Sequence, residues 1–214
     1  QFETEIEDKK LIEAAKMIKE ANKPVIYTGG GIINSGDEAS ELLKEFVDLV
    51  NFPVTNTLMG LGGFNAFDDR FVGMLGMHGT YEANMAMHDC DLMINIGARF
   101  DDRVTGRVDA FSPNSKKIHI DIDASSINKN VQVELPIVGD CAHALEDIIK
   151  VWKSKHKQPD QKAQDSWWKQ IDEWRSKECL DYGDSVEEIK PQLAIERLYE
   201  LTKDMDPLIT TEVG

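Results

Sequence analysis

Short apolar runs alternate along this chain with stretches of helical spacing, and this alternation limits the folds that it can adopt. Six such runs begin at Pro24, Pro53, Leu92, Lys117, Pro136 and Pro207. Helical spacing of apolar residues occupies residues 10–21, 38–50, 80–88 and 142–152. Runs without polar alternation fit strands buried on both faces, and strands alternating with helices form a parallel sheet with right-handed crossovers. The sequence therefore predicts a Rossmann-like α/β fold, a doubly wound parallel sheet of about six strands with helices on both faces.

The distribution of glycine and tryptophan indicates a domain boundary near residue 156. Of the fifteen glycines, all but two lie at or before Gly139, whereas all four tryptophans lie after it. Residues 153–166 are polar and contain a proline, which is typical of a linker. We predict an α/β domain over residues 1–156 and a linker with helical content over 157–190, including a short helix at 167–180. Residues 191–214 then form the first helix and strand of another domain.

Charge and cysteine content exclude several classes of protein. The formal net charge of −15 argues against a nucleic-acid partner, which requires a basic surface. The sequence has no apolar run of about 18 residues, so we expect no membrane span. Its acidic beginning lacks the apolar core of a signal peptide. Three widely spaced cysteines without a CxxC motif fit a reducing, cytoplasmic location rather than a disulfide framework or a zinc site.

Five of the predicted strands are followed directly by glycines or charged residues. These segments are Gly29–Gly31, Asn56–Gly63, Gly97–Arg107, Asp121–Asp123 and Gly139–Asp140. In a parallel sheet the carboxyl ends of the strands share one edge, and open α/β sheets bind their ligands there. Together the five segments predict an extended, nucleotide-like ligand that lies across several strands.

Two of these segments suit a phosphate. Arg99 and Arg103 offer planar forks for charge-assisted hydrogen bonds, although together with Asp101 they also fit a solvated cluster of ion pairs. Gly29–Gly31 would let backbone N–H groups approach a phosphate closely, but the segment does not match GxGxxG. On these residues alone, a tight turn between strand and helix is slightly favoured.

The remaining candidates each have a plain structural alternative. His78 fits a general base, a metal ligand or a polar contact, but a lone histidine is more often structural, and its ten-residue spacing from His88 predicts no zinc site. Asp121 and Asp123 fit a ribose contact, a metal pair or a helix cap, and Asp140 also fits a cap. Leu58 is an apolar residue at a strand end, where a ring system could pack.

The motifs LMGLGGF, LGMHGTYEANMAMHDCD, GARFDDRVTG, HIDID and IVGD resemble the central domain of the acetolactate synthase (acetohydroxyacid synthase) catalytic subunit. Their order and spacing agree from about residue 24 to 140, and the terminal TTEVG resembles the start of that family's diphosphate-binding domain. Residues 150–190 match poorly, as a linker would. The family condenses two 2-ketoacids, with loss of carbon dioxide, in branched-chain amino-acid biosynthesis. It uses thiamine diphosphate, Mg2+ and FAD, and the resemblance implies a homo-oligomer and a regulatory subunit.

The resemblance places FAD in this domain. The FAD contacts that it implies are Gly29, Gly30, Gly31, Thr57, Leu58, Met77, His78, Gly97, Ala98, Arg99, Asp101, Arg103, Asp121, Ile122, Gly139 and Asp140. Met77 and Arg103 would also line the substrate channel. The family's activating glutamate and its metal motif have no match in this sequence. We therefore expect no catalytic or metal-binding residue here, no activity from this chain alone, and weakened retention of FAD.

Two other interpretations stay open at this point. One is another thiamine diphosphate enzyme, of the glyoxylate carboligase or pyruvate oxidase type, which the FDDRVTG run disfavours. The other is a free-standing nucleotide-binding module.

Overall fold

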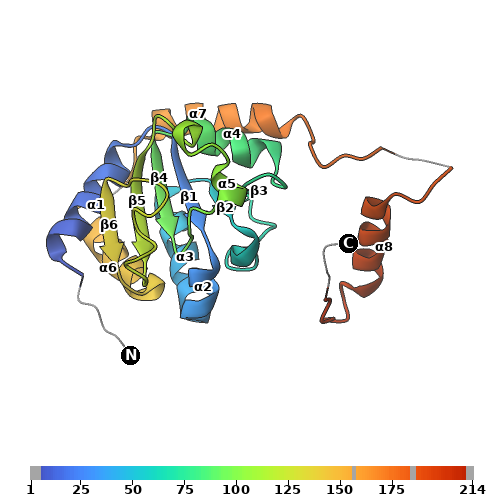
Figure 1. The fold of residues 1–214 in the computed structure, drawn as a ribbon, viewed down its shortest axis with the longest axis horizontal. Helices are drawn as coiled ribbons and strands as arrows, with labels where there is room; N and C mark the ends of the chain where they lie inside the picture. Colours follow the sequence, from blue (N-terminus) through green and yellow to red (C-terminus); the bar gives the residue numbers. More distant parts are fainter. Residues whose placement is uncertain (1–5, 156–157, 184–186, 211–214) are drawn as a thin grey trace. The chain divides into compact units, whose positions relative to one another are not determined.

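The structure is a computed structural model that describes residues 6–155, 158–183 and 187–210. Its first compact unit, residues 1–177, is built on one sheet of six parallel strands, in the order β3-β2-β1-β4-β5-β6 (Figure 1). The strands are β1 (Pro24–Thr28), β2 (Val54–Asn56), β3 (Phe71–Met74), β4 (Leu92–Ile96), β5 (Lys116–Asp121) and β6 (Leu135–Val138). The chain builds outward from β1 to β3, then crosses back to β4, so the winding reverses between β1 and β4. The predicted doubly wound α/β fold is confirmed.

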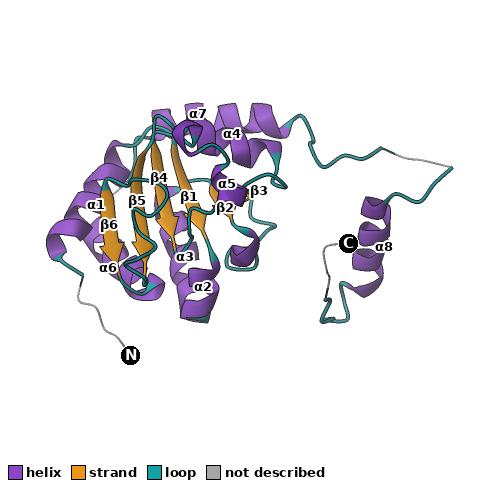
Figure 2. Cartoon of the chain, viewed as in Figure 1, coloured by secondary structure: helices purple, strands orange, loops and turns teal. Residues whose placement is uncertain are grey.

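Helices cover both faces of the sheet (Figure 2). The first face carries α1 (Asp8–Glu20), α2 (Gly30–Ser35), α3 (Asp37–Val50) and α6 (Cys141–Lys155). The second face carries α4 (Tyr81–Asp89) and α7 (Gln161–Arg175), and the short helix α5 (Asp102–Thr105) follows β4. Two 3₁₀ turns complete the unit, η1 (Leu58–Gly60) and η2 (Val108–Ala110).

Two separate cores result, because successive residues of a strand point to opposite faces. Ile26, Ile94 and Ile118 lie side by side in register and pack under the first set of helices. Val25 and Met93, one residue earlier in their strands, pack in the second core with α4 and α7. Burial on both faces explains why these strands read as continuous apolar runs.

Helix α7 runs along the amino-terminal edge of the sheet. Its buried Trp167 donates from Nε1 to the carbonyl of Pro24 at 2.9 Å, and its buried Gln164 donates to the carbonyl of Val50 at 2.5 Å. Ile171 is also fully buried. These contacts belong to the first unit, so this unit continues to Lys177, past the boundary that composition indicates at residue 156.

The sheet has the expected number of strands, but one of the observed strands is not among those predicted. Strand β3 has no counterpart among the predicted runs, because it is a short edge strand interrupted by Gly73 at φ +95°. The strand predicted from Pro207 is wrong for residues 207–210, which form no strand; residues 211–214 lie outside the described residues. Strands need a hydrogen-bonded neighbour, and β-propensity alone does not supply one.

The second unit comprises residues 178–214, and its main element is α8 (Pro191–Thr202). Pro191 occupies the first helical turn, as the sequence predicts. Within the described ranges of the whole chain, no helix is both long and apolar enough to cross a membrane.

Candidate functional site

The predicted site residues all follow the carboxyl ends of strands. Gly29–Gly31 follow β1, Thr57 and Leu58 follow β2, and Met77 and His78 follow β3. Gly97–Arg103 follow β4, Asp121 ends β5 and Ile122 comes next, and Gly139 and Asp140 follow β6. Six strands thus bring the whole set to one edge, across the point where the winding reverses. In doubly wound folds the ligand crevice lies at this point.

At the reversal point, glycines let two backbone segments touch. The Gly29 N–H donates to the carbonyl of Ile96 at 3.1 Å, and the Gly31 N–H donates to the carbonyl of Gly97 at 2.9 Å. A Cβ on Gly31 would lie only 2.5 Å from the Gly97 Cα. These two N–H groups therefore have acceptors within the protein, which favours the tight-turn interpretation of Gly29 and Gly31 over a phosphate-binding role for these two amides.

The two arginines after β4 present their charge to solvent. Arg99 pairs with Asp101 at 2.9 Å and Arg103 with Asp102 at 3.5 Å, while the arginine side chains stay 70% and 78% exposed. The ion pairs that were the structural alternative are therefore present. Exposed pairs of this kind contribute little to stability, so an arriving anion displaces them at low cost.

The backbone on either side of Arg99 is firmly held. The buried Asn95 amide donates to the Ala98 carbonyl at 2.7 Å and accepts from the Ala98 N–H at 3.0 Å. The buried Phe100 ring packs against Tyr27 and His119, with centroids 6.0 and 5.1 Å away. Sequence reasoning missed Asn95 and His119, although each is a polar residue inside an otherwise apolar run.

The turn after β3 lies beside the short helix after β4. The Met77 N–H donates to the Arg103 carbonyl at 3.2 Å, which places the two predicted channel residues next to each other. Asn84 holds this turn through two hydrogen bonds to Gly76, at 3.0 and 3.2 Å. His78 is exposed here, with its imidazole at the surface.

Large apolar side chains are exposed at the same edge. Met77 is 68% exposed, and Leu58 and Met59 after β2 are 67% and 73% exposed. Thr57 caps the turn that carries them, since its hydroxyl accepts from the Gly60 N–H at 3.0 Å. Exposed apolar groups at a ligand-binding edge suit a flat ring system.

Two of the acidic candidates, Asp123 and Asp140, accept hydrogen bonds from neighbouring residues, whereas Asp121 has an oxygen without such a partner among the described residues. Asp140 accepts from the Ser35 hydroxyl at 2.8 Å and from the Ala142 N–H at 2.9 Å, so it caps α6 and fixes α2 to it. Asp123 accepts from Ser125, which lowers the pKa of the aspartate. Asp121 differs: its Oδ1 accepts from the Asp123 N–H at 2.8 Å, and its Oδ2 lies 3.7 Å from Nε2 of His119.

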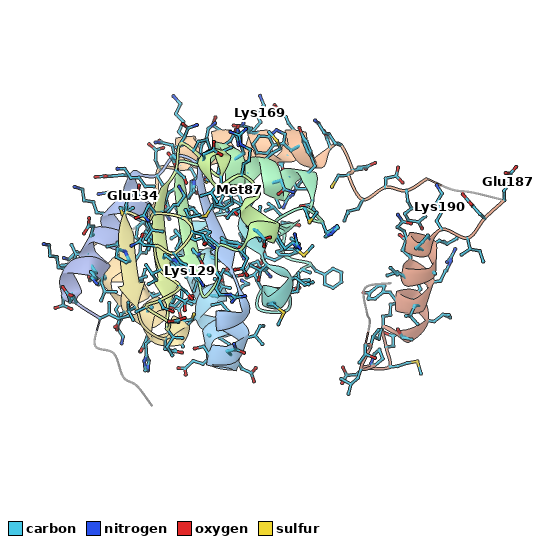
Figure 3. The ribbon with its side chains drawn as sticks, in the orientation of Figure 1. Met87, Lys129, Glu134, Lys169, Glu187 and Lys190 are labelled. Atoms are coloured by element: carbon cyan, nitrogen blue, oxygen red, sulfur yellow. The ribbon has the colours of Figure 1, made fainter. Side chains whose placement is uncertain are left out.

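Two of the cavities in the described part of the chain bear on the choice of site, and they lie at opposite edges of the sheet. One of about 120 Å³ is at the carboxyl edge, lined by Arg99, Phe100, Asp101, Asp123, Ser125, Ser126, Lys129 and Asn130; Figure 3 labels Lys129, on the β5–β6 connection. A larger one of about 460 Å³ lies at the amino edge, between Arg70, Trp168 and Arg175.

The two arginines that line the larger cavity already form ion pairs or hydrogen bonds within the protein. Arg70 pairs with Asp68 at 2.6 Å and with Asp48 at 2.8 Å, and Arg175 donates to the carbonyls of Asp69 and Phe71. We therefore assign the functional site to the carboxyl edge. Among the residues that the structure describes, no three His, Cys, Asp or Glu side chains gather as metal ligands would.

Comparison with known proteins gives a family and a set of relatives. Residues 11–148 match the model of the thiamine pyrophosphate enzyme, central domain. The acetolactate synthase large subunit of Haemophilus influenzae is 45% identical over 202 residues, which is 94% of this chain and 35% of that protein. The acetolactate synthase isozyme 3 large subunit of Escherichia coli is 47% identical over 203 residues, 94% of this chain and 34% of that protein.

A more distant relative aligns over nearly the full chain. The acetolactate synthase large subunit of Pyropia yezoensis is 41% identical over 212 residues, 99% of this chain and 35% of that protein. The chain thus spans about a third of the length of the curated relatives that it matches. Since the family model covers well over half of its residues, the chain belongs to the family of thiamine pyrophosphate enzyme central domains.

Proposed function

We propose that this chain is the FAD-binding central portion of an acetolactate synthase large subunit. The parent enzyme would condense two 2-ketoacids, with loss of carbon dioxide, to acetohydroxyacids in branched-chain amino-acid biosynthesis. The relatives named above all carry the acetolactate synthase name, which favours this activity over one of the glyoxylate carboligase or pyruvate oxidase type. Family membership argues against a free-standing nucleotide-binding module.

One observation carries the assignment of FAD: guanidinium, carboxylate and exposed apolar side chains meet at the carboxyl edge where the winding reverses. Arg99 and Arg103 fit a diphosphate, because exposed guanidinium groups give charge-assisted hydrogen bonds to its oxygens. Asp121 fits a ribose hydroxyl. Leu58 and Met77 offer apolar contact to a ring. In this family FAD supplies no net redox chemistry, so the part of these residues is to bind and orient it.

Other parts of the proposal concern the parent protein. Membership of the family supports thiamine diphosphate as its cofactor, and we propose that Mg2+ and the activating glutamate belong to segments outside this chain. The words "large subunit" in the relatives' names favour a second, regulatory subunit, and we propose a homo-oligomer of the large one. Free thiols at the buried Cys90 and Cys141 support a reducing cytoplasm. We also propose that residues 191–214 begin the diphosphate-binding domain.

Titration of FAD into the 214-residue chain, followed by flavin fluorescence and calorimetry, tests the proposal. Arg99 and Arg107 form a matched pair, because each is exposed and each pairs with an aspartate two residues later. Only Arg99 belongs to the proposed site. We expect Arg99→Ala to weaken FAD binding about tenfold or more, since a hydrogen bond to a charged group contributes about 1.5–3 kcal/mol. Arg107→Ala should change it less than about twofold, within the scatter of exposed ion-pair effects. Absence of saturable binding, or an equal loss in both variants, would contradict the assignment.

A further inference from the structure

We propose that His119 is a positioning residue for the dinucleotide: it orients the carboxylate of Asp121 that accepts a hydrogen bond from a ribose hydroxyl. This inference rests on the proposed FAD site. His119 itself is fully buried and does not reach the ligand. Its effect is exerted through Asp121, two residues later and on the same face of β5.

The His119 ring has a hydrogen-bonding capacity that the structure leaves unused. Within the described residues, neither Nδ1 nor Nε2 has a hydrogen-bond partner. A buried polar group without a partner is unfavourable, so such a group in a native protein calls for an explanation. Nε2 lies 3.7 Å from Oδ2 of Asp121, and a movement of about 0.7 Å would bring the two atoms to hydrogen-bond distance.

The two oxygens of Asp121 have different surroundings. Oδ1 accepts from the Asp123 N–H at 2.8 Å, which fixes one side of the carboxylate. Oδ2 faces His119, and the side chain retains only 11% exposure, at the open edge of the sheet. A carboxylate oxygen accepts more than one hydrogen bond. An Nε2–H on His119 would therefore hold Oδ2 from below while a ligand hydroxyl donates to it from the edge. Hydrogen bonds of a functional site are often long in the free protein and shorten in the complex.

Tyr27 provides an internal control for this argument. It lies in the same row of the sheet as His119, with Asn95 between them in register. It too packs against Phe100, and its buried hydroxyl also has no partner among the described residues. Tyr27 is two strands away from His119, about 10 Å across the sheet.

The test is FAD titration into the 214-residue chain and its variants. The amide nitrogen of glutamine lies near the position of Nε2 in histidine, whereas that of asparagine lies near Nδ1. We expect His119→Gln to keep FAD affinity within about threefold and His119→Asn to lower it about tenfold, because a charge-assisted hydrogen bond is lost. Tyr27→Phe should leave it unchanged. In an Asp121→Ala background, His119→Asn should have no further effect.

A second measurement does not depend on the variants. Nitrogen-15 NMR of the histidine-labelled wild-type chain should show His119 protonated at Nε2, with that resonance shifting when FAD is added. The inference is overturned by an Nδ1–H tautomer, by unchanged affinity in His119→Asn, or by equal losses in both His119 variants. Where a variant fails to fold, the tautomer decides. If the wild-type chain binds no FAD, the proposed function fails and this inference fails with it; if it binds FAD but His119→Asn binds equally well, only the inference fails.

Discussion

Replacing Gly97 by alanine should destabilise the first unit more than replacing Gly106 by alanine. Both residues have positive φ, +63° and +54°, a backbone conformation in which a side chain costs about 1–3 kcal/mol. At Gly97 an added Cβ would also lie 2.6 Å from the Gly31 Cα and 2.8 Å from Sγ of Cys141, whereas at Gly106 the described structure places no atom within 4 Å. Overpacking of this kind adds about 1–3 kcal/mol. We therefore expect losses of about 2–6 kcal/mol for Gly97→Ala and about 1–3 kcal/mol for Gly106→Ala.

Urea unfolding followed by tryptophan fluorescence measures both losses, since Trp152 and Trp167 are buried in the first unit. The difference between the variants reports mainly on the contact between the two backbone segments, because both positions have positive φ and only at Gly97 do atoms stand in the way of a Cβ. Equal free energies of unfolding would refute the reasoning that these glycines permit close packing at the reversal point. A change in the slope against urea would instead indicate an altered denatured state.

Three further changes test other parts of the first unit. The Arg70 guanidinium lowers the pKa of Asp68 from 3.8 to about 2. The stabilisation that this ion pair gives the folded chain is therefore present above pH 3.8 and is lost as the pH falls towards 2. Arg70→Met should remove this pH dependence of stability in an acid titration followed by circular dichroism. Thr80→Ala removes the cap of α4 and should cost about 1–2 kcal/mol in urea unfolding, whereas Thr80→Ser should cost less because it keeps the hydroxyl. A chain ending at Lys177 should keep the unfolding midpoint of the first unit. One ending at residue 157 should lose about 3–6 kcal/mol, because it lacks α7 and with it the burial of two apolar side chains, Trp167 and Ile171; equal midpoints would contradict this assignment of α7.

The fold was predictable wherever burial on both faces left a continuous apolar run. Strands β1, β4 and β5 are fully or almost fully buried and were each predicted from such a run. Strand β3 was not, because an edge strand needs less burial and Gly73 breaks its pattern. The start of α7 was also missed because its residues are polar. Gln164 looks like part of a linker in the sequence, yet it is buried and its amide donates to the carbonyl of Val50 at the end of α3.

The edge of the sheet that gathers the candidate residues was predictable, but the hydrogen bonds made by their backbone groups were not. Parallel strands place their carboxyl ends together, so any set of residues that follows them shares one edge. The N–H groups of Gly29 and Gly31 donate to carbonyls at the end of strand β4, which is distant in sequence, so the sequence does not tell whether these groups are free to bind a ligand. Asn95 bonds to Ala98, three residues later, so a local pattern could have found that pair. The ring of His119 packs against Phe100, which follows another strand, and a pattern within one strand carries no information about such a partner.

These contacts explain why Arg99 is a better anchor for a ligand than its exposure alone suggests. Gly97 is fixed by the turn at Gly31, Ala98 by the Asn95 amide, and Phe100 by rings from β1 and β5. The exposed guanidinium therefore projects from a backbone held by four strands or turns, and only its side chain must be ordered on binding. Such preorganisation reduces the entropic cost of association. At the proposed FAD site, the glycines of this edge would therefore contribute by shaping the backbone from which Arg99 projects, rather than by contacting phosphate with the amides of Gly29 and Gly31.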